Sequence, residues 1–530
     1  MIVFGSRHSD LAMAQTRHVA ERVRAVTGEP FEIVHIETTG DRVLERPLDA
    51  IGVKGAFTRE LEEALRSGRI DAAVHSLKDL PVEDAPGLCV GAIPERVDPR
   101  DVLIAREDAL DPAAGDPPLK AGARVGTSSP RRRLALSACR KDLATADVRG
   151  NVPTRVRKVR DGDYDATLLA GAGLKRLGLD LSGLASLALD PGRFVPAPGQ
   201  GALAVQCRAG DSRVRGILSR IHDSGAARCV EAERRLLLGL GGGCSLPLGA
   251  LCTEERRGFR LRAALFAPNG AALQCDAWTG DIDGLVERLA FEWRALRERS
   301  LRGVAVLLPR PDGEGGDLAE ALRFCGAGVE VVSWTRTEAI EPTDGGREAL
   351  ERADALAFTS ARAARRYIEL AGGFRSAEKP RCFAVGRATA AALLAGGFDA
   401  DVAGGSGGAA LAALAAASLG AGAEVVYPCA QERRPAFEEG CAARGVRVVP
   451  VPVYRTSRSE PPAAPFARPD VVLVTAPSSV FGLAAVPETP CVAIGSATAE
   501  AMREIGITPA AVCADAGLVS VVETLAEVRA

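Results

Sequence analysis

The feature that most constrains the fold is an alternation of short apolar, β-type runs with helix-type runs along all 530 residues. The run IVFGS at 2–6 leads into LAMAQTRHVAERVRAV, and FEIVHIE follows it. A new start, RGVAVLLPRP, begins the same alternation again near residue 302. This pattern is typical of α/β architecture with mainly parallel sheets, and the length predicts several domains.

Breaks in the pattern suggest where the domains divide. The passages PERVDPR and PAPGQG cross from one strand pattern to another, and two crossings predict a discontinuous first domain with a second domain inserted. In the second half, FTSARAARRYI resembles VTAPSSVFGL, and CFAVGRATAAAL resembles CVAIGSATAEAM, which predicts two similar lobes. The expected domains are residues 1–99 with 200–219, 100–199 and 220–300, followed by lobes at 302–335 with 456–530 and at 343–449.

Composition narrows the class of protein and its partners. The net charge of −2 gives no long-range attraction for nucleic acid. The thirteen cysteines form no CxxC pair and no Cys/His cluster, which argues against a metal site and against a secreted disulfide framework. The first residues lack the pattern of a signal peptide, so we expect a cytoplasmic protein. The uncharged segment 404–423 is rich in Ala and Gly, which favours a core helix over a membrane span.

Clusters of arginines and hydroxyl residues point to a small polyanionic ligand. Arg7 and Ser9 lie in a strand-to-helix turn, where free N–H groups suit a carboxylate or phosphate. Aromatic residues make up only 4% of the chain, so base stacking is unsupported, whereas arginine forks bind carboxylates bidentately. The motifs GTSSPRR and RGNVPTR contribute Thr127, Ser128, Ser129, Arg131, Arg132, Arg149 and Arg155.

Two loops carry candidate catalytic side chains. HSLKDLP at 75–81 ends a buried strand with Lys78 and Asp79, and GGGCSLP at 241–247 exposes the sulfur of Cys244 among glycines. Strand ends that face a cleft are where α/β enzymes keep their chemistry, and an accessible thiol can carry a covalent group. Taken alone, Asp79 is equally compatible with a turn cap, and Cys244 with a small apolar residue in a tight turn.

The order of these motifs resembles the porphobilinogen deaminase family over residues 1–300. The resemblance implies a three-domain α/β enzyme whose first two domains are similar to type II periplasmic binding proteins. It also implies a dipyrromethane cofactor, built from the substrate porphobilinogen and linked through a thioether to Cys244. In this interpretation Asp79 stabilises positive charge on pyrrole nitrogen and moves protons. The implied carboxylate partners are Arg7, Lys78, Arg131, Arg132, Arg149, Arg155 and Arg176, with Ser9, Thr127, Ser128, Ser129 and Gln200 as hydrogen-bond partners.

Some positions depart from the pattern of that family. Asp10 stands at the helix start where the family usually has Pro. The segment that resembles the family's active-site lid contains Lys54 and Phe57, with Ala50, Val53 and Ala56 in place of the usual Lys, Gly and Leu. These departures imply weaker anion binding near Arg7 and a lid that grips the growing chain less well.

The second half resembles the uroporphyrinogen-III synthase family through LLPRP, AFTSARAA, FAVGRATAAAL, VPVYRT, VTAPSSV and AIGSATAEAM. The implied reaction closes a linear tetrapyrrole with inversion of its last ring and loss of water. All five histidines lie at or before residue 222, so acid help for departure of the hydroxyl group is expected from Tyr454 or from backbone N–H groups. Two alternatives remain: a deaminase with a silent or regulatory second half, and a pair of solute-binding modules without chemistry. Further hydroxyl and backbone contacts are expected from Thr359, Ser360, Gly386, Thr475, Ser478, Ser479 and Thr498.

Overall fold

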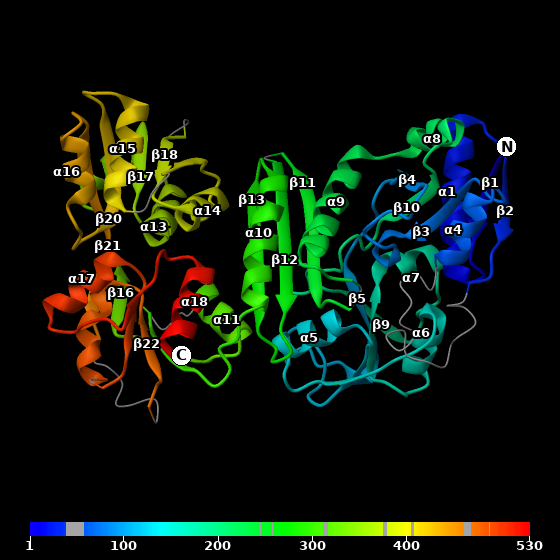
Figure 1. Ribbon diagram of the computed structural model, residues 1–530, viewed down its shortest axis with the longest axis horizontal. Coiled ribbons are helices and arrows are strands. Elements are labelled where there is room, and N and C mark those ends of the chain that lie inside the picture. Colours follow the sequence, from blue (N-terminus) through cyan, green and yellow to red (C-terminus); the bar gives the residue numbers. More distant parts are fainter. Residues whose placement is uncertain are drawn as a thin grey trace. The chain divides into compact units, whose positions relative to one another are not determined.

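The computed structural model of the chain describes residues 1–38, 58–243, 245–256, 258–310, 316–374, 379–403, 407–459, 468–486 and 488–529. It divides into two compact units, one of residues 1–300 with 320–326 and the other of residues 301–319 with 327–530. Both units combine β-sheets with covering helices (Figure 1), so the predicted α/β class is confirmed.

The first sheet of the N-terminal unit is assembled from distant parts of the chain. Its strand order is β2-β1-β3-β10-β4. The late strand β10 pairs antiparallel with both β3 and β4. The apolar core on one face gathers Phe4, Val74 and Val205 against Val19 of helix α1. The elements are β1 (Ile2–Ser6), α1 (Asp10–Thr27), β2 (Phe31–His35), α4 (Arg59–Arg66), β3 (Ala72–Ser76), the 3₁₀ helix η1 (Leu77–Asp79), β4 (Leu88–Ala92), β10 (Leu203–Arg208), α8 (Ser212–Leu218) and η3 (Ser219–Ile221).

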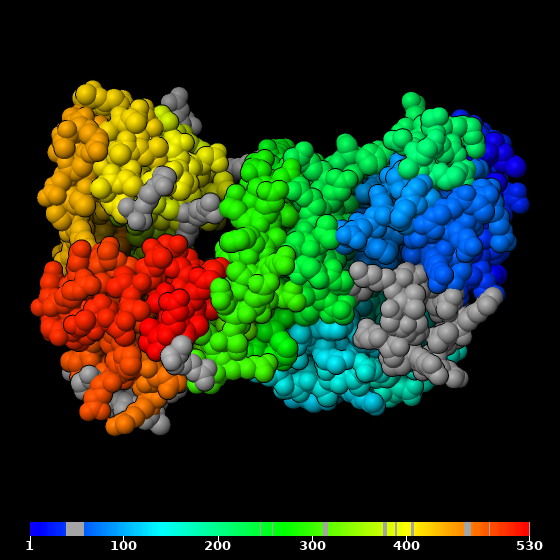
Figure 2. Space-filling model, in the orientation of Figure 1, coloured from blue at the N-terminus to red at the C-terminus, as the bar shows by residue number. Residues whose placement is uncertain are grey.

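Helix α1 shows why the chain turns where it does in this sheet. Ser9 caps its first turn by accepting from the backbone N–H of Ala12, and Gly28 ends it with φ of 74°. Helix α8 contacts β4 although more than a hundred residues separate them in sequence. Figure 2 shows the green atoms of α8 against the blue N-terminal residues.

The second sheet is formed by the segment between β4 and β10. Its order is β7-β6-β8-β5-β9, with β5 antiparallel to β8 and β9. Leu103, Val125 and Leu168 lie in its core together with Phe266 of the next sheet. Its elements are β5 (Asp101–Arg106), η2 (Glu107–Ala109), β6 (Arg124–Gly126), α5 (Pro130–Cys139), β7 (Ala144–Ala146), α6 (Val152–Arg160), β8 (Ala166–Ala170), α7 (Gly171–Leu177) and β9 (Leu184–Ala188).

The third sheet is a three-stranded antiparallel meander, β11-β12-β13, with helices α9 and α10 beside it (Figure 1). Trp293 of α10 and Val230 of α9 are fully buried or nearly so. The elements are α9 (Ser224–Gly239), β11 (Leu248–Glu255), β12 (Gly258–Phe266), β13 (Ala272–Thr279) and α10 (Ile282–Arg297).

The second unit contains two sheets, and again the earlier sheet is completed by later strands. The order β15-β14-β22-β23-β24 is parallel throughout. Its elements are β14 (Ala305–Pro309), β15 (Gly328–Val332), β22 (Val471–Val474), the 3₁₀ helix η5 (Pro477–Ala485), β23 (Cys491–Ala493), α17 (Ser496–Glu504), β24 (Ala511–Val512) and α18 (Leu518–Arg529). Helix α11 (Gly316–Phe324) spans the division between the units.

The six-stranded sheet of the second unit has the order β16-β21-β20-β17-β18-β19, and only β16 is antiparallel to its neighbour. Apolar cores lie on both faces, around Phe358 on one and Phe383 on the other. Its elements are β16 (Thr335–Ala339), α12 (Asp344–Glu351), β17 (Ala355–Phe358), α13 (Ala361–Ala371), β18 (Arg381–Ala384), α14 (Arg387–Ala395), β19 (Ala400–Val402), α15 (Gly408–Leu419), β20 (Glu424–Ala430), α16 (Ala436–Ala442) and β21 (Arg447–Arg458).

The first unit does not have the mainly parallel sheets that we expected: its first two sheets are mixed, and its third is antiparallel. β10 and β5 each enter a sheet directly after a crossing between sheets, without a helix that returns the chain to its starting edge. Both strands run antiparallel to the neighbours with which they pair.

Candidate active site

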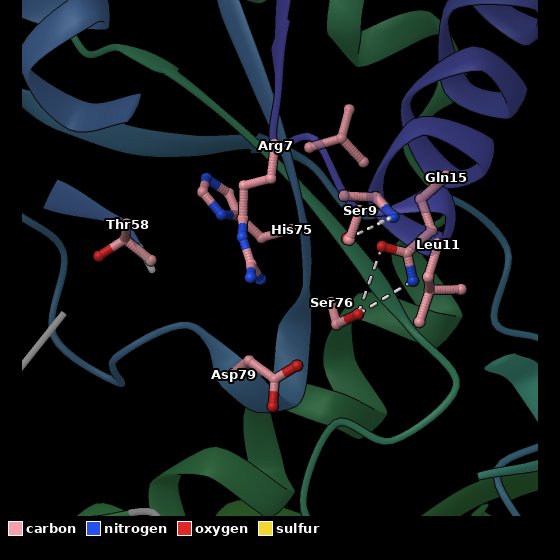
Figure 3. Close-up of a pocket in the computed structure, with 10 residues that line it drawn as sticks. Arg7, Ser9, Leu11, Gln15, Thr58, His75, Ser76 and Asp79 are labelled. Carbon is pink, nitrogen blue, oxygen red and sulfur yellow. Dashed lines mark hydrogen bonds between the residues drawn. The ribbon is translucent and has the colours of Figure 1, made fainter. Parts of the chain in front are cut away.

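A pocket lies where the parallel strands β1 and β3 end. Its cavity volume is about 90 Å³. Parallel strands carry their carboxyl ends to one edge of a sheet, so residues from both loops meet there. The lining residues are Arg7, Ser9, Leu11, Ala12, Gln15, Thr58, Val74, His75, Ser76 and Asp79 (Figure 3).

Asp79 occupies the position that its motif suggested, with an exposed side chain in the short helix η1 after β3. The side chain of Arg7 extends toward it from the end of β1 (Figure 3). Ser9 lies in the same pocket, but its hydroxyl already caps α1. Asp10 is exposed at the start of that helix, where the family pattern has Pro. The structure therefore brings three predicted residues together around one cavity.

Four further polar residues line this pocket and were not singled out from the sequence: Gln15, Thr58, His75 and Ser76. Gln15 Nε2 donates to Ser76 Oγ at 3.0 Å, and this pair forms one wall. His75 is only 7% exposed, and its Nε2 has no hydrogen-bond partner in the described part of the chain. Burial lowers the pKa of His75 to about 4, opposed by Gln206 and reinforced by Arg7. The position of His75 next to Lys78 and Asp79 in HSLKDLP was the available signal.

Behind Asp79, Lys78 leads into a buried polar cluster. Lys78 Nζ donates to Gln200 Oε1 at 3.4 Å. Gln200 Nε2 in turn donates to the carbonyl of Pro99 at 2.7 Å and to Asp101 Oδ1 at 2.8 Å. Gln200 therefore links the predicted lysine to a carboxylate that no sequence motif singled out.

Asp101, at the start of β5, is the centre of this cluster. Arg132 donates to its Oδ1 through Nε at 3.1 Å and Nη2 at 2.7 Å, and Arg131 Nη1 forms an ion pair with its Oδ2 at 2.8 Å. Burial by itself would raise the pKa of Asp101, but the two guanidinium groups outweigh burial and hold that pKa well below its usual range. Asp101 is therefore a permanent anion within a cationic site.

Two of the other predicted arginines, Arg155 and Arg176, lie next to residues of this cluster. Arg155 Nε donates to the carbonyl of Gly150, and burial together with nearby Arg132 lowers the pKa of Arg155. Arg176 Nη2 donates to the carbonyl of Gly201 at 3.0 Å, and burial lowers the pKa of Arg176 to about 10. Arg149 is exposed just before helix α6.

The three predicted hydroxyls mainly support the backbone of α5 and its neighbours. Ser129 caps helix α5, Thr127 Oγ1 accepts from the N–H of Ser129, and Ser128 Oγ exchanges hydrogen bonds with the backbone of Val148. Several predicted residues lie outside the described residues: Cys244, Ala50, Val53, Lys54, Ala56 and Phe57.

In the second unit, two tyrosines within β20 and β21 meet the two hydroxyl residues that follow β17. Tyr454 OH and Ser360 Oγ are 3.3 Å apart, and Tyr427 OH and Thr359 Oγ1 are 2.8 Å apart. Burial raises the pKa of Tyr427 to about 12, partly offset by Thr359. Tyr454 is half-buried, and the guanidinium carbon of Arg362 lies 5.9 Å from the centre of its ring.

The remaining predicted contacts of this unit are less concentrated. Thr475 Oγ1 donates to the carbonyl of Pro309 at 3.2 Å, Ser478 is exposed, and the buried Ser479 hydroxyl has no partner among the described residues. Gly386 and Thr498 lie at the starts of α14 and α17.

Among the described residues, no group of three or more His, Cys, Asp or Glu side chains is arranged to hold a metal ion. None of the helices within those ranges is long and apolar enough to cross a membrane. The Ala-rich segment instead forms helix α15, which buries Leu411, Ala412 and Ala415.

Comparison with known proteins gives matches along both units. The family model "Porphobilinogen deaminase, dipyromethane cofactor binding domain" matches residues 2–216, and "Porphobilinogen deaminase, C-terminal domain" matches residues 227–286. "Uroporphyrinogen-III synthase HemD" matches residues 316–523. A porphobilinogen deaminase of Roseiflexus sp. strain RS-1 is 47% identical over 270 residues, which are 51% of this chain and 87% of that protein.

Further relatives extend the same picture. A porphobilinogen deaminase of Sorangium cellulosum strain So ce56 is 45% identical over 274 residues, or 52% of this chain and 89% of its own. A solved mutant uroporphyrinogen III synthase from the extremely thermophilic bacterium Thermus thermophilus is 20% identical, with a TM-score of 0.31, over 42% of this chain and 99% of that one. The chain belongs to the porphobilinogen deaminase family in its first part and carries a uroporphyrinogen-III synthase domain behind it.

Proposed function

We propose that this chain condenses four porphobilinogen molecules into linear hydroxymethylbilane and then cyclises that product, with inversion of the last ring, to uroporphyrinogen III. The observation that supports the first reaction best is one exposed carboxylate, Asp79, in a pocket with Arg7 and next to Lys78. The alternative of a silent or regulatory second unit is less favoured, because that unit matches a synthase family model.

The donor set fits a dipyrromethane bound as an anion. Each pyrrole ring of such a group carries an acetate and a propionate, so it needs several cations close to one acid–base residue. Arg131, Arg132 and Lys78 form one cluster beside Asp79, and Arg155 and Arg176 lie at its edge. When bound to Cys244, the dipyrromethane supplies the nucleophilic pyrrole carbon on which the chain grows.

The residues of the chain then divide the remaining tasks. Arginine forks bind the carboxylates and fix the register of each new ring. Asp79 would stabilise positive charge that develops on pyrrole nitrogen and would accept the protons released at each condensation. In the second unit, Tyr454 OH donates to the hydroxyl group that leaves, and the hydroxyl and backbone groups around it hold carboxylates.

The proposal includes further features that rest on sequence and family. The domain boundaries are those expected from the sequence, residues 1–99 with 200–219, 100–199, 220–300, 302–335 with 456–530, and 343–449. The partner is porphobilinogen, without nucleic acid, membrane or metal, and the location is the cytoplasm. Support for the location comes from cysteines scattered in a pattern unsuited to a secreted framework.

The cofactor test uses denatured intact mass. The purified chain should carry an adduct of dipyrromethane size, and the Cys244→Ser chain should lack it. Absence of the adduct from the unaltered chain would contradict the deaminase proposal.

The activity test incubates the chain with porphobilinogen alone and identifies the oxidised porphyrin. Type III uroporphyrin is expected, whereas type I alone would contradict a synthase role for the second unit. Asp79→Asn should abolish condensation, because a neutral amide neither stabilises the cation nor accepts the proton. The matched control Asp84→Asn changes an exposed carboxylate of the same loop and should leave turnover unchanged.

A further inference from the structure

We propose that Asp101 is a positioning residue of the deaminase site, whose carboxylate orients Arg131 and Arg132 and balances their charge beside Lys78. None of the predicted site residues supplied an anion at this place. The inference deepens the proposed function, on which its activity readout rests.

The hydrogen bonds of Arg132 show how strongly its orientation is fixed. Nε and Nη2 donate to Asp101, and Nη1 donates to the carbonyl of Leu168 at 2.9 Å. A guanidinium group has five N–H bonds, so one N–H remains on each terminal nitrogen. Arg132 is 7% exposed, and these two N–H groups are what it can offer to an external carboxylate.

Arg131 is held differently. Its Nη1 faces both Asp101 Oδ2 and the carbonyl of Val195, each at 2.8 Å. Nε and Nη2 have no acceptor among the described residues, so this edge keeps the two adjacent donors that match a carboxylate bidentately. Asp101 thus takes one side of Arg131 and leaves the carboxylate-binding side available.

Backbone geometry braces the third partner of Asp101. Gln200 is 1% exposed and lies between Gly199 and Gly201, whose φ angles are 74° and 90°. A Cβ at Gly201 would lie 2.5 Å from the carbonyl oxygen of Val97, so only glycine permits this approach. Both Nε2 donors of Gln200 are used, by Pro99 and Asp101, which directs its Oε1 to Lys78.

Besides orienting the two arginines, Asp101 offsets part of the positive charge that faces Lys78. Burial lowers the pKa of Lys78, Asp79 and Asp101 oppose that fall, and Arg132 and Arg131 add to it. With Lys78 charged, three cations and the one carboxylate of Asp101 leave a net charge of +2 in this cluster, before Asp79 is counted. Without Asp101, Lys78 would face two guanidinium groups and only one carboxylate, that of Asp79.

The first test measures Lys78 directly. The chain has only seven lysines, so competitive amine labelling at a series of pH values, followed by peptide mass spectrometry, resolves Lys78. In Asp101→Asn the labelling midpoint of Lys78 should move to lower pH. The control variant is Asp147→Asn. It removes the exposed ion-pair partner of Arg133, which lies on helix α5 next to Arg131 and Arg132, and it should leave the Lys78 midpoint unchanged. Coincident Lys78 curves for the unaltered chain and Asp101→Asn would overturn the proposal.

A second variant keeps the test decisive if Asp101→Asn unfolds. Asp101→Asn combined with Arg132→Gln removes one charge of each sign, so the net charge facing Lys78 returns to its original value. The Lys78 midpoint of this double variant should return toward that of the unaltered chain. A Lys78 midpoint well below that of the unaltered chain, or Lys78 labelling like that of an unfolded chain, would show that charge balance is not the role of Asp101.

The functional readout is separate. Asp101→Asn should lower kcat/KM for porphobilinogen on the order of tenfold, as loss of a residue that orients binding groups commonly does. Most of that loss should fall on KM, with the adduct on Cys244 still present by intact mass. An unchanged KM would contradict the positioning role. If the unaltered chain carries no adduct, the proposed function fails, while the labelling results still decide the role of Asp101 within the cluster.

Discussion

At the residue scale, His75 shows how burial can keep one titratable group of a pocket neutral while a neighbouring carboxylate, Asp79, stays exposed. Its ring lines the pocket that contains Asp79, yet its pKa of about 4 keeps it neutral near pH 7. A neutral imidazole adds no charge beside Arg7. In the proposed reaction, proton transfer is therefore assigned to Asp79, and His75 contributes polarity without competing for the proton.

The titration of His75 can be measured from the hydrogen exchange rate of its ring C2 position by peptide mass spectrometry. We expect a midpoint near pH 4 for His75, because its folded-state pKa lies below the ordinary value of 6.5. The exposed residue His18 provides an internal comparison from the same digest. A midpoint of His75 near 6.5 would contradict this prediction.

The same shift predicts how stability depends on pH. The pKa of His75 is lowered on folding, so its stabilising contribution is complete above pH 6.5 and is lost as pH falls from 6.5 toward 4. The full effect is roughly 3 kcal/mol. His75→Gln should lose less stability than the unaltered chain over this pH range, measured by hydrogen exchange of peptides from β3. The control His18→Gln should behave like the unaltered chain.

The phenol of Tyr454 is expected to control which isomer forms. Tyr454→Phe should lower the rate of type III formation about tenfold, the equivalent of one hydrogen bond, and the share of type I should rise. Chromatography of the oxidised porphyrins measures both isomers. Tyr367→Phe is the matched control, because Tyr367 is 2% exposed in the apolar core of the same sheet. An unchanged isomer ratio in Tyr454→Phe would contradict the acid role.

Site residues that belong to local sequence motifs could be predicted from the sequence. Site residues whose partners are distant in the sequence could not. Arg7, Ser9 and Asp79 converge on one pocket as expected. Asp101 was missed because its partners Arg131 and Arg132 come thirty residues later, and only the fold brings them into contact. A single aspartate at a strand start gives no sign of such partners.

At the scale of elements, Glu233 shows how one helix holds several segments together. It is fully buried in α9, and all of its partners are donors: Arg96 Nη1 and Nη2, the N–H of Gly199 and the N–H of Cys252. Helix α9 is thereby tied to β11, to the loop that carries Gln200, and to the segment before β5. The geometry of the active-site loop depends on this contact.

Glu233→Gln should therefore destabilise the chain by about 3 kcal/mol, because an amide nitrogen would face a donor and leave Arg96 without its counter-charge. The expected result is a lower melting temperature of the first unit, followed by calorimetry. Glu231→Gln alters an exposed glutamate of the same helix and should change the melting temperature little. Equal melting temperatures for the two variants would contradict the assignment.

Element types were largely predictable from the sequence, whereas strand direction was not. Apolar periodicity correctly predicted the α/β class and the Ala-rich core helix α15. Periodicity does not encode which way a strand enters a sheet, so the antiparallel placement of β10 and β5 was missed. Similarly, VTAPSSVFGL resembles FTSARAARRYI, but the chain forms the 3₁₀ helix η5 there and α13 in its counterpart.

At the scale of the whole molecule, the two compact units each have their own apolar cores. This separation predicts complementation between chains. Asp79→Asn, which keeps an intact second unit, should restore type III formation when mixed with Tyr454→Phe, which keeps an intact first unit. The share of type III should rise with the concentration of Asp79→Asn, because intermediate released by one chain is captured by another. No rise at any concentration would contradict independent units.

The placement of β10 also has a consequence for how the chain emerges during synthesis. Strand β10, which lies between β3 and β4 in the first sheet, comes only at residues 203–208, so β3 and β4 lack their shared neighbour until the complete second sheet has been translated. The second unit repeats this order, since β14 waits for β22. In each unit the inserted segment can therefore fold before the sheet that surrounds it in sequence is complete. During synthesis, strand edges of β3 and β4 stay unpaired until β10 is made, and later an edge of β14 stays unpaired until β22 is made. Nascent chains arrested before residue 203 should therefore protect β5 and β8 from protease while β3 remains sensitive.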